Sequence, residues 1–503
     1  MDTTGTGSGP LFLGIDLGTG SVKGTLATVD GDVVATATRP VTVRRPHPGF
    51  VEMDSTTQWW DTACSIAREL AGTAGDRAVA AVGVSGLGPC LLMTGDDLEP
   101  LHPAILYGVD FRAEEQIASM NAALGPDAIF ERCGKDLSSQ AVGPKLGWVR
   151  EQRPHVWRSA TRWFSSHSFV VARLTGEWVL DHHTASQVDP FYDLGARDWA
   201  RDWVEEMLGD VSLPRLGWPH EVAGYLRREA ADATGLTAGT PVVFGTVDAW
   251  AEAFSVGARR PGDLMLMYGS TLFMIQILPS VASGSGLWTT CGVEPGSYTL
   301  AAGMSSAGSL VSWTHDVVGG APYEELVAEA RAIPPGSDGL LVLPYFAGER
   351  SPIYDASARG VMVGLTLEHG RGHLFRAAYE GVAHGIRQNL DVMSGVAGRP
   401  ERVIAVGGGV KGGLWTQIVS DVLHMPQELP AVTVGASYGD ALLAAIGIGA
   451  VPAESDWTRA AHVVRPDPGA AAVYERFHES YRTLYPATRE HMHAMACAQR
   501  DGT

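Results

Sequence analysis

The sequence predicts an α/β protein built from two related halves. Apolar stretches typical of buried strands alternate with amphipathic stretches typical of helices, which is the pattern of layered α/β domains. A glycine-containing turn between two apolar strands occurs at 11–27 and recurs at 264–277. A chain of 503 residues is also too long for one ordinary hydrophobic core, so we expect two or more domains.

The first of these turns carries residue types suited to binding phosphate and a metal ion. Its glycines let backbone N–H groups approach an oxyanion closely, and its hydroxyls can add donors. Asp16 ends the preceding strand, where a carboxylate can hold a hydrated Mg²⁺ beside phosphates. An ordinary hairpin with a glycine turn is the alternative interpretation. The turn itself consists of Gly18, Thr19, Gly20 and Ser21.

The second turn, Gly269-Ser270-Thr271, lies between two apolar strands of the same kind. Two unrelated hairpins would also give this pattern. Two structurally related halves that clasp one nucleotide explain it more economically, so the pair of hairpins favours phosphate binding.

Composition and charge limit the partners of the protein. The formal net charge of −19 argues against a nucleic-acid or anionic-membrane surface, which would need clustered Lys and Arg. The five cysteines are scattered and form no CxxC pair, which favours free thiols in a reducing compartment. The first residues lack the features of a signal peptide, and no uncharged apolar run approaches the roughly 18 residues of a membrane span. We therefore expect a cytoplasmic protein.

The apolar pattern predicts the order of the main elements. Buried strands are expected at 79–85, 241–245, 340–344 and 402–406. Helices are expected at 56–71, 321–332, 373–393 and 413–423. The division into domains is predicted at 10–244 and 245–490, and residues 1–9 and 498–503 are expected to be disordered.

Two further segments carry candidate chemistry. Asp248 follows a buried strand and begins a predicted helix, where a carboxylate can orient an attacking hydroxyl and accept its proton. In isolation, a helix-capping aspartate is the simpler interpretation. Gly407, Gly408 and Gly409 lie between a strand and a helix and permit close backbone approach to a base, ribose or phosphate, although a tight turn alone would also use them.

The order of these segments resembles the FGGY carbohydrate kinases, within the actin-like, ribonuclease-H-like ATPase superfamily. The stretch 360–387 matches the C-terminal signature of that family, and 145–154 resembles its first signature, although Val142 departs from the usual pattern there. The matching positions are Gly360, Gly364, Leu365, His373, Leu374, Ala377, Ala378, Tyr379 and Glu380 in the first stretch and Lys145, Trp148 and Glu151 in the second. The resemblance implies two ribonuclease-H-like domains, each a mixed β-sheet flanked by helices, with the active site in the cleft between them.

The resemblance also implies roles for individual residues. Asp248 matches the catalytic base, and Asp16 matches the aspartate near Mg²⁺ and the γ-phosphate, so these two are the expected metal site. ATP and Mg²⁺ are the implied cofactors, and a homodimer is an expectation from the resemblance alone. The residues expected to contact ATP are Gly18, Thr19, Gly20, Ser21 and Lys23 in the first hairpin, Gly269, Ser270 and Thr271 in the second, and Gly407, Gly408 and Gly409 in the glycine loop.

The segments expected to bind the sugar depart from the family pattern. Gly88 and Pro89 stand where xylulokinases carry His-Gly, and the Trp-x-Asp-x-Arg segment is replaced by Tyr107, Asp110 and Arg112 with one extra residue. Asp110 and Arg112 could contact sugar hydroxyls or simply form a surface ion pair. Trp250 could stack on a sugar face or belong to the core.

A ketopentose such as xylulose is the leading expectation for the substrate. Another sugar, a polyol or a sugar acid is the alternative. Two different classes stay open beside a sugar kinase: a non-catalytic sugar or nucleotide sensor on the same scaffold, and an actin-like or chaperone-like ATPase.

Overall fold

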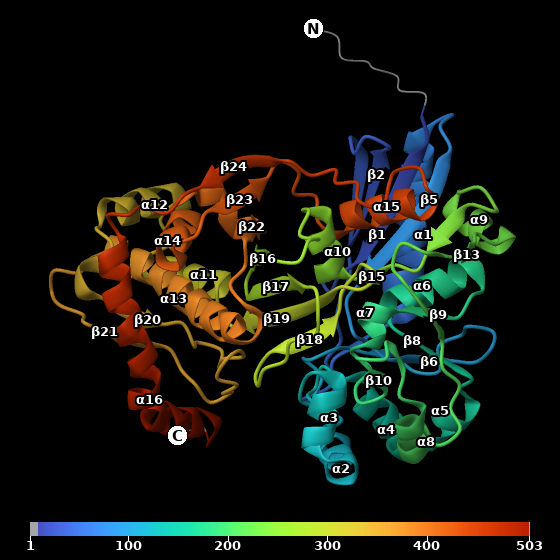
Figure 1. Cartoon of the computed structure of the whole chain (residues 1–503), viewed down its shortest axis with the longest axis horizontal. Helices are drawn as coiled ribbons and strands as arrows, with labels where there is room; N and C mark the ends of the chain where they lie inside the picture. The colour runs from blue at the N-terminus through green and yellow to red at the C-terminus, as the bar shows by residue number, and fades with distance from the viewer. Residues whose placement is uncertain (1–8, 502–503) are drawn as a thin grey trace, which may run out of the picture.

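The chain folds into two lobes, each built around a seven-stranded mixed β-sheet with helices on its faces (Figure 1). This computed structural model describes residues 9–501. The N-terminal sheet is blue to green in Figure 1, and the C-terminal sheet runs from yellow-green to red-orange. The predicted two-domain α/β architecture is confirmed.

The N-terminal sheet has the order β13-β14-β5-β1-β2-β3, and β15 pairs with β5 beyond the end of β14. Because β15 extends this sheet to Val247, the sheet reaches three residues past the predicted domain boundary at 244/245, which stays a prediction. The strands of this sheet are β1 (Leu11–Leu17), β2 (Ser21–Thr28), β3 (Val33–Pro40), β5 (Val79–Gly86), β13 (Val222–Tyr225), β14 (Pro241–Val243) and β15 (Thr246–Val247).

The C-terminal sheet has the order β18-β19-β17-β16-β22-β23-β24. Its strands are β16 (Asp263–Tyr268), β17 (Leu272–Leu278), β18 (Trp288–Cys291), β19 (Tyr298–Met304), β22 (Arg402–Val406), β23 (Gln427–Pro430) and β24 (Ala460–Val464). Five two-stranded pairs complete the β-structure: β4 (Glu52–Met53) with β7 (Ala104–Ile105), β6 (Leu92–Thr94) with β8 (Arg162–Phe164), β9 (Val179–Asp181) with β12 (Arg215–Gly217), β10 (Tyr192–Asp193) with β11 (Asp198–Trp199), and β20 (Leu341–Leu343) with β21 (Val361–Val363).

The two sheets share one pairing pattern around their hairpins. In the N-terminal sheet, β1 pairs antiparallel with β2, β2 pairs antiparallel with β3, and β1 pairs parallel with β5. In the C-terminal sheet, β16 pairs antiparallel with β17, β17 pairs antiparallel with β19, and β16 pairs parallel with β22. The two glycine turns therefore occupy equivalent places in two related halves, as the repeated hairpin predicts.

Helices cover the sheets, and the expected ones form with shifted ends. The stretch expected at 56–71 begins as a π-helical turn, η1 (Ser55–Trp60), and continues as α1 (Asp61–Ala74). The other helices of the N-terminal part are α2 (Glu114–Leu124), α3 (Pro126–Cys133), α4 (Val142–Gln152), α5 (Pro154–Ser159), α6 (Ser166–Thr175), α7 (His182–Ala185), α8 (Arg201–Leu208) and α9 (Arg228–Thr234). The remaining α-helices are α10 (Asp248–Ser255), α11 (Gly308–Val317), α12 (Tyr323–Ala332), α13 (Arg371–Ala397), α14 (Leu414–Leu423), α15 (Ala436–Gly447) and α16 (Ala471–Asp501), and two short 3₁₀ helices are η2 (Ser337–Gly339) and η3 (Gly408–Gly412).

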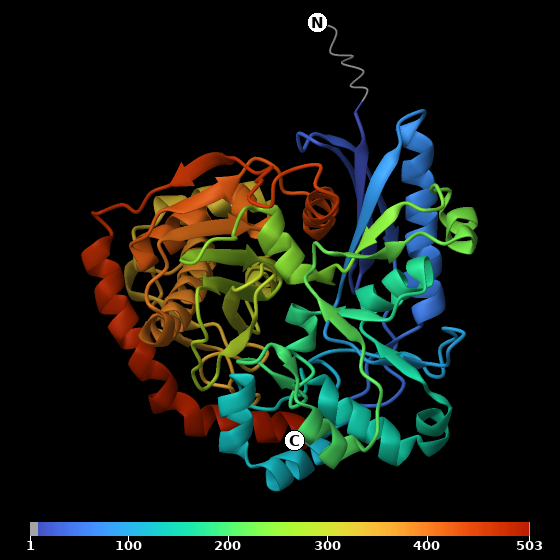
Figure 2. The same cartoon turned by 45° about the vertical axis from the view of Figure 1, so that its right-hand side comes forward.

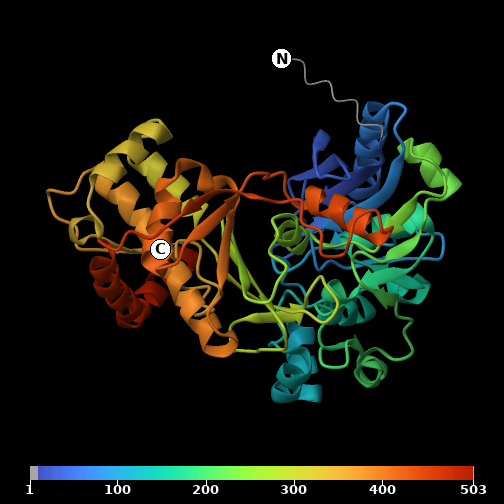
Figure 3. The same cartoon turned by 45° about the horizontal axis from the view of Figure 1, so that its top comes forward.

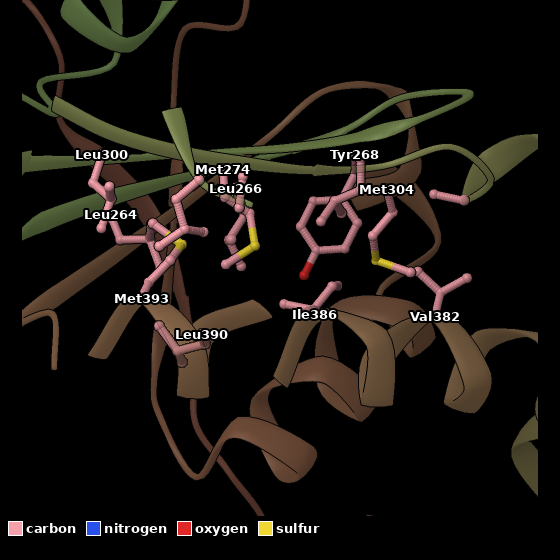
Figure 4. Packing of buried hydrophobic residues seen from close by; sticks show 14 of the residues in the cluster. Leu264, Leu266, Tyr268, Met274, Leu300, Met304, Val382, Ile386, Leu390 and Met393 are labelled. Carbon is pink, nitrogen blue, oxygen red and sulfur yellow. The ribbon is translucent and has the colours of Figure 1, made fainter. Parts of the chain in front are cut away.

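The long helix α13 forms the core of the C-terminal lobe with one face of its sheet. Val382, Ile386, Leu390 and Met393 recur at steps of four, four and three residues, so they share one helix face. Figure 4 shows this face opposite side chains of β16, β17 and β19, and all of the residues that it labels are buried. Full burial of each such side chain stabilises the fold by about 1.5–3 kcal/mol.

One helix of the C-terminal half packs on the N-terminal sheet. Helix α15 lies against β1 and β5 in Figures 1 and 3, although 350 residues or more separate it from them in sequence. The contact is close enough to require glycine, because a Cβ atom at Gly14 would lie 1.8 Å from the carbonyl oxygen of Ser437. A Cβ atom at Gly83 would lie 2.2 Å from the carbonyl oxygen of Asp440. Helix α15 therefore joins the two lobes.

The C-terminal helix α16 runs along the outside of the C-terminal lobe (Figure 2). It continues to Asp501, so the expectation of disorder is wrong for 498–501, where the chain prolongs the helix. The same expectation for residues 1–8 and 502–503 lies outside the described residues. Over residues 9–501, no helix is both long and apolar enough to cross a membrane.

Candidate active site

Several carboxyl groups gather where the N-terminal sheet meets α10 and α15, and they include Asp440 of α15, whose pKa is raised by burial and by the charges of Asp16 and Asp248. Asp16 is the next-to-last residue of β1, Asp248 begins α10, and Glu252 follows one helical turn later. Lys23 is the direct partner of Asp16 in the β1–β2 register, so the two side chains lie on the same face of the sheet. The strand-to-helix turn thus brings a carboxylate of α10 to the end of β1.

Burial is the main reason why the pKa values of the Asp16, Asp248 and Glu252 carboxyl groups are higher than usual. It raises the pKa of Asp248 to about 7; Glu252 adds to this rise, while the Ala249 N–H and Lys23 oppose it. Burial and the neighbouring Asp248 hold the pKa of Asp16 well above its usual range. Burial also raises the pKa of Glu252, against the opposing charge of Lys23. The cluster therefore carries more carboxyl groups than its one lysine can balance.

This excess of negative charge fits a divalent cation. Oδ1 of Asp16 is buried and has no hydrogen-bond partner among the described residues. Across the part of the chain that the structure describes, no three His, Cys, Asp or Glu side chains come close enough together to hold a metal ion by themselves. Mg²⁺ usually binds to one or two carboxylates and completes its shell with water and substrate phosphates, so the carboxylates of Asp16 and Asp248 have the chemistry to hold it.

A small cavity opens between the lobes beside Asp248. Its volume is about 180 Å³, well below the ~300–1,000 Å³ of sites for drug-sized ligands. The N-terminal half lines it with Gly88, Tyr107, Gln140, Gln187 and Val247, α10 with Asp248, Ala249 and Trp250, and the C-terminal half with Met267, Thr271, Phe273, Trp288 and Arg350. A cavity of this size, with several polar groups and aromatic walls, suits a small polar molecule such as a monosaccharide.

Trp250 forms a fixed wall of this cavity. Its indole N–H donates to Oγ1 of Thr299 at 3.0 Å, and its ring meets that of Phe273 edge-on with centroids 5.6 Å apart. The ring of His183 lies 4.1 Å away on another side. The indole is buried in the core and also lines the cavity, and its stacking on a sugar face stays a prediction.

Asp110 and Arg112 are bound to each other instead of facing the cavity. The Arg112 guanidinium donates to both carboxylate oxygens of Asp110 and pairs with Glu52 at 3.0 Å. The carboxylate also accepts from the Val51 N–H. Both charged side chains are almost fully buried, so the ion pair lies inside the N-terminal lobe and not on its surface, and neither residue lines the cavity. Pro89 likewise lies outside the cavity lining.

A second, larger cavity of about 720 Å³ lies in the C-terminal lobe. Gly408 and Gly409 of the predicted glycine loop line it, together with Lys411 and Gly412. Its other walls come from α11, α12, α13 and the start of α14: Gly308, Val311, Ser312, Tyr323, Glu324, Val327, Ala328, Arg331, Tyr379 and Trp415. The stacked rings of Tyr379 and Trp415, with centroids 5.2 Å apart, give it an aromatic end suited to a nucleobase.

Gly407 packs against the backbone of Tyr268 and does not line the cavity. Its φ of +95° disfavours any other residue, and a Cβ atom there would lie 2.6 Å from the carbonyl oxygen of Tyr268. Gly409 is confined too, because a Cβ atom would lie 2.7 Å from the indole of Trp415. The loop is therefore held between β16 and α14, while Gly408 has open space around it, because a Cβ atom there would meet nothing within 4 Å.

The second hairpin lies between the two cavities. Thr271 lines the small one, while the carbonyl of Gly269 accepts from the N–H of Gly308, which lines the large one. The carbonyl of Ser270 accepts from the N–H groups of Ala307 and Ser309. The start of α11 is thus bound to the hairpin that separates the cavities.

The first hairpin closes by a hydrogen bond from the Gly18 N–H to the Ser21 carbonyl. Thr19 and Gly20 are exposed at its tip, and Lys23, the third residue of β2, is exposed as well. These residues line neither cavity. The exposed side chains of Thr19 and Lys23 remain accessible to a ligand that enters between the lobes.

The structure adds residues that the sequence did not single out. Glu252 could have been found, because it lies four residues after Asp248 on the same helix. Gln140, Gln187, Trp288 and Arg350 lie in loops or at a strand end, and no spacing pattern connects them to the cavity.

Comparison with known proteins agrees with this arrangement. The profile for the N-terminal domain of the FGGY family of carbohydrate kinases matches residues 11–255, and the profile for its C-terminal domain matches residues 264–448. The xylulose kinase of Escherichia coli is 30% identical over 94% of this chain and 98% of its own. The gluconokinase of Bacillus subtilis is 25% identical, with 94% of both chains covered.

Solved structures show the same two-lobed fold. The crystal structure of xylulose kinase from Rhodospirillum rubrum superposes with a TM-score of 0.89 at 32% identity, and the match covers 96% of this chain and all of that one. The two domain profiles together with these relatives cover nearly the whole chain. The protein therefore belongs to the FGGY family of carbohydrate kinases, ATP-dependent phosphotransferases with an actin-like ATPase fold that act on sugar hydroxyls.

Proposed function

We propose that the protein transfers the γ-phosphate of ATP to a hydroxyl of a ketopentose, with xylulose as the substrate. The small cavity beside Asp248 carries this proposal, because it is of monosaccharide size and shares the second hairpin with the larger, nucleotide-sized cavity. The xylulose kinases of Escherichia coli and Rhodospirillum rubrum, at 30% and 32% identity, support the choice of sugar.

Asp248 is the base in this proposal. Its carboxylate lines the sugar cavity, and its raised pKa of about 7 matches that of a proton acceptor working at neutral pH. It orients the attacking hydroxyl and takes its proton as the new oxygen–phosphorus bond forms. The backbone N–H groups of the two hairpins are the donors expected to stabilise charge on the transferred group.

Asp16 and Asp248 are the residues that would hold Mg²⁺. A bound Mg²⁺ neutralises charge on the phosphates during phosphoryl transfer. The buried, unpartnered Oδ1 of Asp16 supports its place here, and Lys23 is the nearby cation that offsets part of the carboxylate charge.

A sugar acid is the second candidate substrate, favoured by Arg350. Arg350 lines the sugar cavity, and its guanidinium donates to the carbonyl of Met304; the charge of the adjacent Glu349 acts on it, but among the described residues it forms no ion pair within 4.0 Å. An arginine without such a partner is a good binding group for a substrate carboxylate. The Bacillus subtilis gluconokinase among the relatives is consistent with this candidate.

Coupled ADP release across ketopentoses, ketohexoses, polyols and sugar acids tests the proposal. We expect the highest kcat/KM with xylulose. If gluconate or another sugar acid gives the highest value and Arg350→Met abolishes that preference, the second candidate is correct instead. ADP release that is equally fast without any sugar would contradict both.

The family resemblance also supports a cytoplasmic homodimer. Light scattering coupled to size-exclusion chromatography would give twice the monomer mass if this is correct, and the monomer mass if it is not.

A further inference from the structure

Two glutamine side chains line the N-terminal wall of the sugar cavity, and the surrounding protein orients both amides. We propose that they select the sugar by opposite hydrogen-bonding roles: Gln140 donates to one sugar oxygen through Nε2, and Gln187 accepts from a sugar hydroxyl through Oε1. This inference rests on the proposed function, because it takes this cavity as the sugar site.

The orientation of Gln140 follows from its contact with Gly108. Oε1 of Gln140 accepts from the backbone N–H of Gly108 at 3.0 Å. A backbone N–H can only donate, so the amide oxygen has to face it and the amide nitrogen is left for a ligand. The Ser139 hydroxyl donates to the Gly108 carbonyl at 2.9 Å, which ties the same two loops together. The side chain is confined there, because a Cβ atom at Gly108 would lie 2.7 Å from the Gln140 carboxamide carbon.

The orientation of Gln187 follows from its contact with His183. Nδ1 of His183 lies 2.7 Å from the Cys291 carbonyl, which can only accept, so Nδ1 carries a proton. Burial lowers the pKa of His183 to about 4, so near neutral pH the ring is uncharged and Nε2 is an acceptor. Nε2 of Gln187 lies 3.0 Å from that nitrogen and must be the donor. Oε1 of Gln187 is left, and it has no hydrogen-bond partner among residues 9–501.

Rotating either carboxamide by about 180° would break its hydrogen bond to the protein. A flipped Gln140 would place N–H against the Gly108 N–H, and a flipped Gln187 would place an oxygen against the lone pair of His183. Each flip would leave a hydrogen-bonding group of the protein unsatisfied: the half-buried Gly108 N–H in one case and the buried Nε2 of His183 in the other. The cavity therefore presents a donor and an acceptor at fixed places, so it favours the sugar epimer whose hydroxyls match both.

Sugar affinity in single variants tests this assignment. Trp250 and Trp288 line the cavity, so their fluorescence reports sugar binding without turnover. With xylulose, or with the best sugar of the panel, we expect Gln140→Met and Gln187→Met to raise the sugar Kd and KM by roughly 5- to 100-fold. The KM for ATP should not change. Gln116→Met is the matched control, because Gln116 is a buried glutamine of the same lobe that bonds to Glu151 and lines neither cavity.

Two further comparisons separate hydrogen bonding from a general loosening of the site. Gln140→Glu keeps an acceptor for the Gly108 N–H but loses the amide donor, so it should weaken sugar binding as much as Gln140→Met. A deoxy-sugar that lacks the hydroxyl bound by Gln187 should bind wild type and Gln187→Met with equal affinity.

Unchanged sugar affinity in both methionine variants would overturn the assignment, as would a Gln140→Glu variant that binds like wild type. A wild-type protein that binds the sugar tightly but does not phosphorylate it would count against the proposed function alone. The two failures are therefore distinguishable.

Discussion

Asp248 is half-buried beside other carboxyl groups, and this environment raises its pKa. A surface aspartate has a pKa of about 3.9 and is a weak base at neutral pH. Burial and the charge of Glu252 raise the pKa of Asp248 to about 7, so the free enzyme holds a mixture of its protonated and ionised forms near neutrality. Activity that depends on the ionised form must then fall as the pH falls.

The raised pKa of Asp248 predicts how activity depends on pH. We expect kcat/KM for the sugar to drop about tenfold per pH unit below about pH 7, because only the ionised Asp248 accepts the proton. Glu252→Gln removes one negative charge beside Asp248, so it should move this limb of the profile to lower pH. A profile that stays flat from pH 5.5 to 8, or that moves to higher pH in Glu252→Gln, would contradict the assignment.

At the residue scale, the sequence predicted the groups that lie at the ends of strands and the starts of helices. Asp16 and Asp248 were found in this way. Gln140 and Gln187 could not be, because their places depend on contacts with Gly108 and His183 that arise only when separate loops pack together. The sequence allows a pairing of Asp110 with Arg112, but the burial of this pair inside the lobe depends on tertiary packing that local sequence does not show.

At the scale of elements, the second hairpin is held in place by the start of α11. Three backbone hydrogen bonds join them, and Gly308 makes this approach possible, because a Cβ atom there would lie 2.5 Å from the Gly269 carbonyl oxygen. The hairpin and α11 should therefore keep their relative position only when this residue is glycine.

Substitution of Gly308 should thus impair use of ATP. We expect Gly308→Val to raise the KM for ATP by roughly tenfold or more, because the side chain would push α11 away from the hairpin and into the large cavity. Steady-state kinetics with varied ATP measures this. Gly395→Ala on the exposed side of α13 is the control, since a Cβ atom there meets nothing within 4 Å. An unchanged KM for ATP in Gly308→Val would show that the contact does not shape the site.

The main elements were predictable because strands and helices bury apolar faces with different periods. The strand at 402–406 forms with the predicted ends, and α14 begins one residue later than expected. The strand expected at 340–344 forms as β20, but it pairs only with β21 outside both large sheets. Apolar character predicted that it would be buried, and it could not predict its partner.

At the scale of the whole molecule, α15 determines how the lobes are joined. It belongs to the C-terminal half in sequence and packs on β1 and β5 of the N-terminal half. Two buried hydroxyl contacts fix it there: Thr25 with Ser437 at 2.7 Å, and Ser85 with Asp440 at 2.6 Å. The sequence indicated two halves, but it did not indicate that a helix of the second half packs on the sheet of the first. Contacts between residues 350 or more positions apart leave no local pattern.

Gly14 tests this junction. We expect Gly14→Ala to destabilise the protein by about 1–3 kcal/mol, because its Cβ atom would lie 1.8 Å from the Ser437 carbonyl oxygen and α15 would have to move. Thermal unfolding gives the change. Gly72→Ala in α1, where a Cβ atom meets nothing within 4 Å, should be neutral or stabilising. Equal melting temperatures for Gly14→Ala and wild type would contradict the close junction.

The measurement that tests the central claim most directly is sugar-dependent ADP release by wild type and by Asp248→Asn, with ATP binding followed in parallel. Loss of a general base predicts that kcat falls by roughly 10²–10⁴-fold in the variant while its affinity for ATP is retained. Near-normal turnover in Asp248→Asn would remove Asp248 from its role as the base and contradict the account.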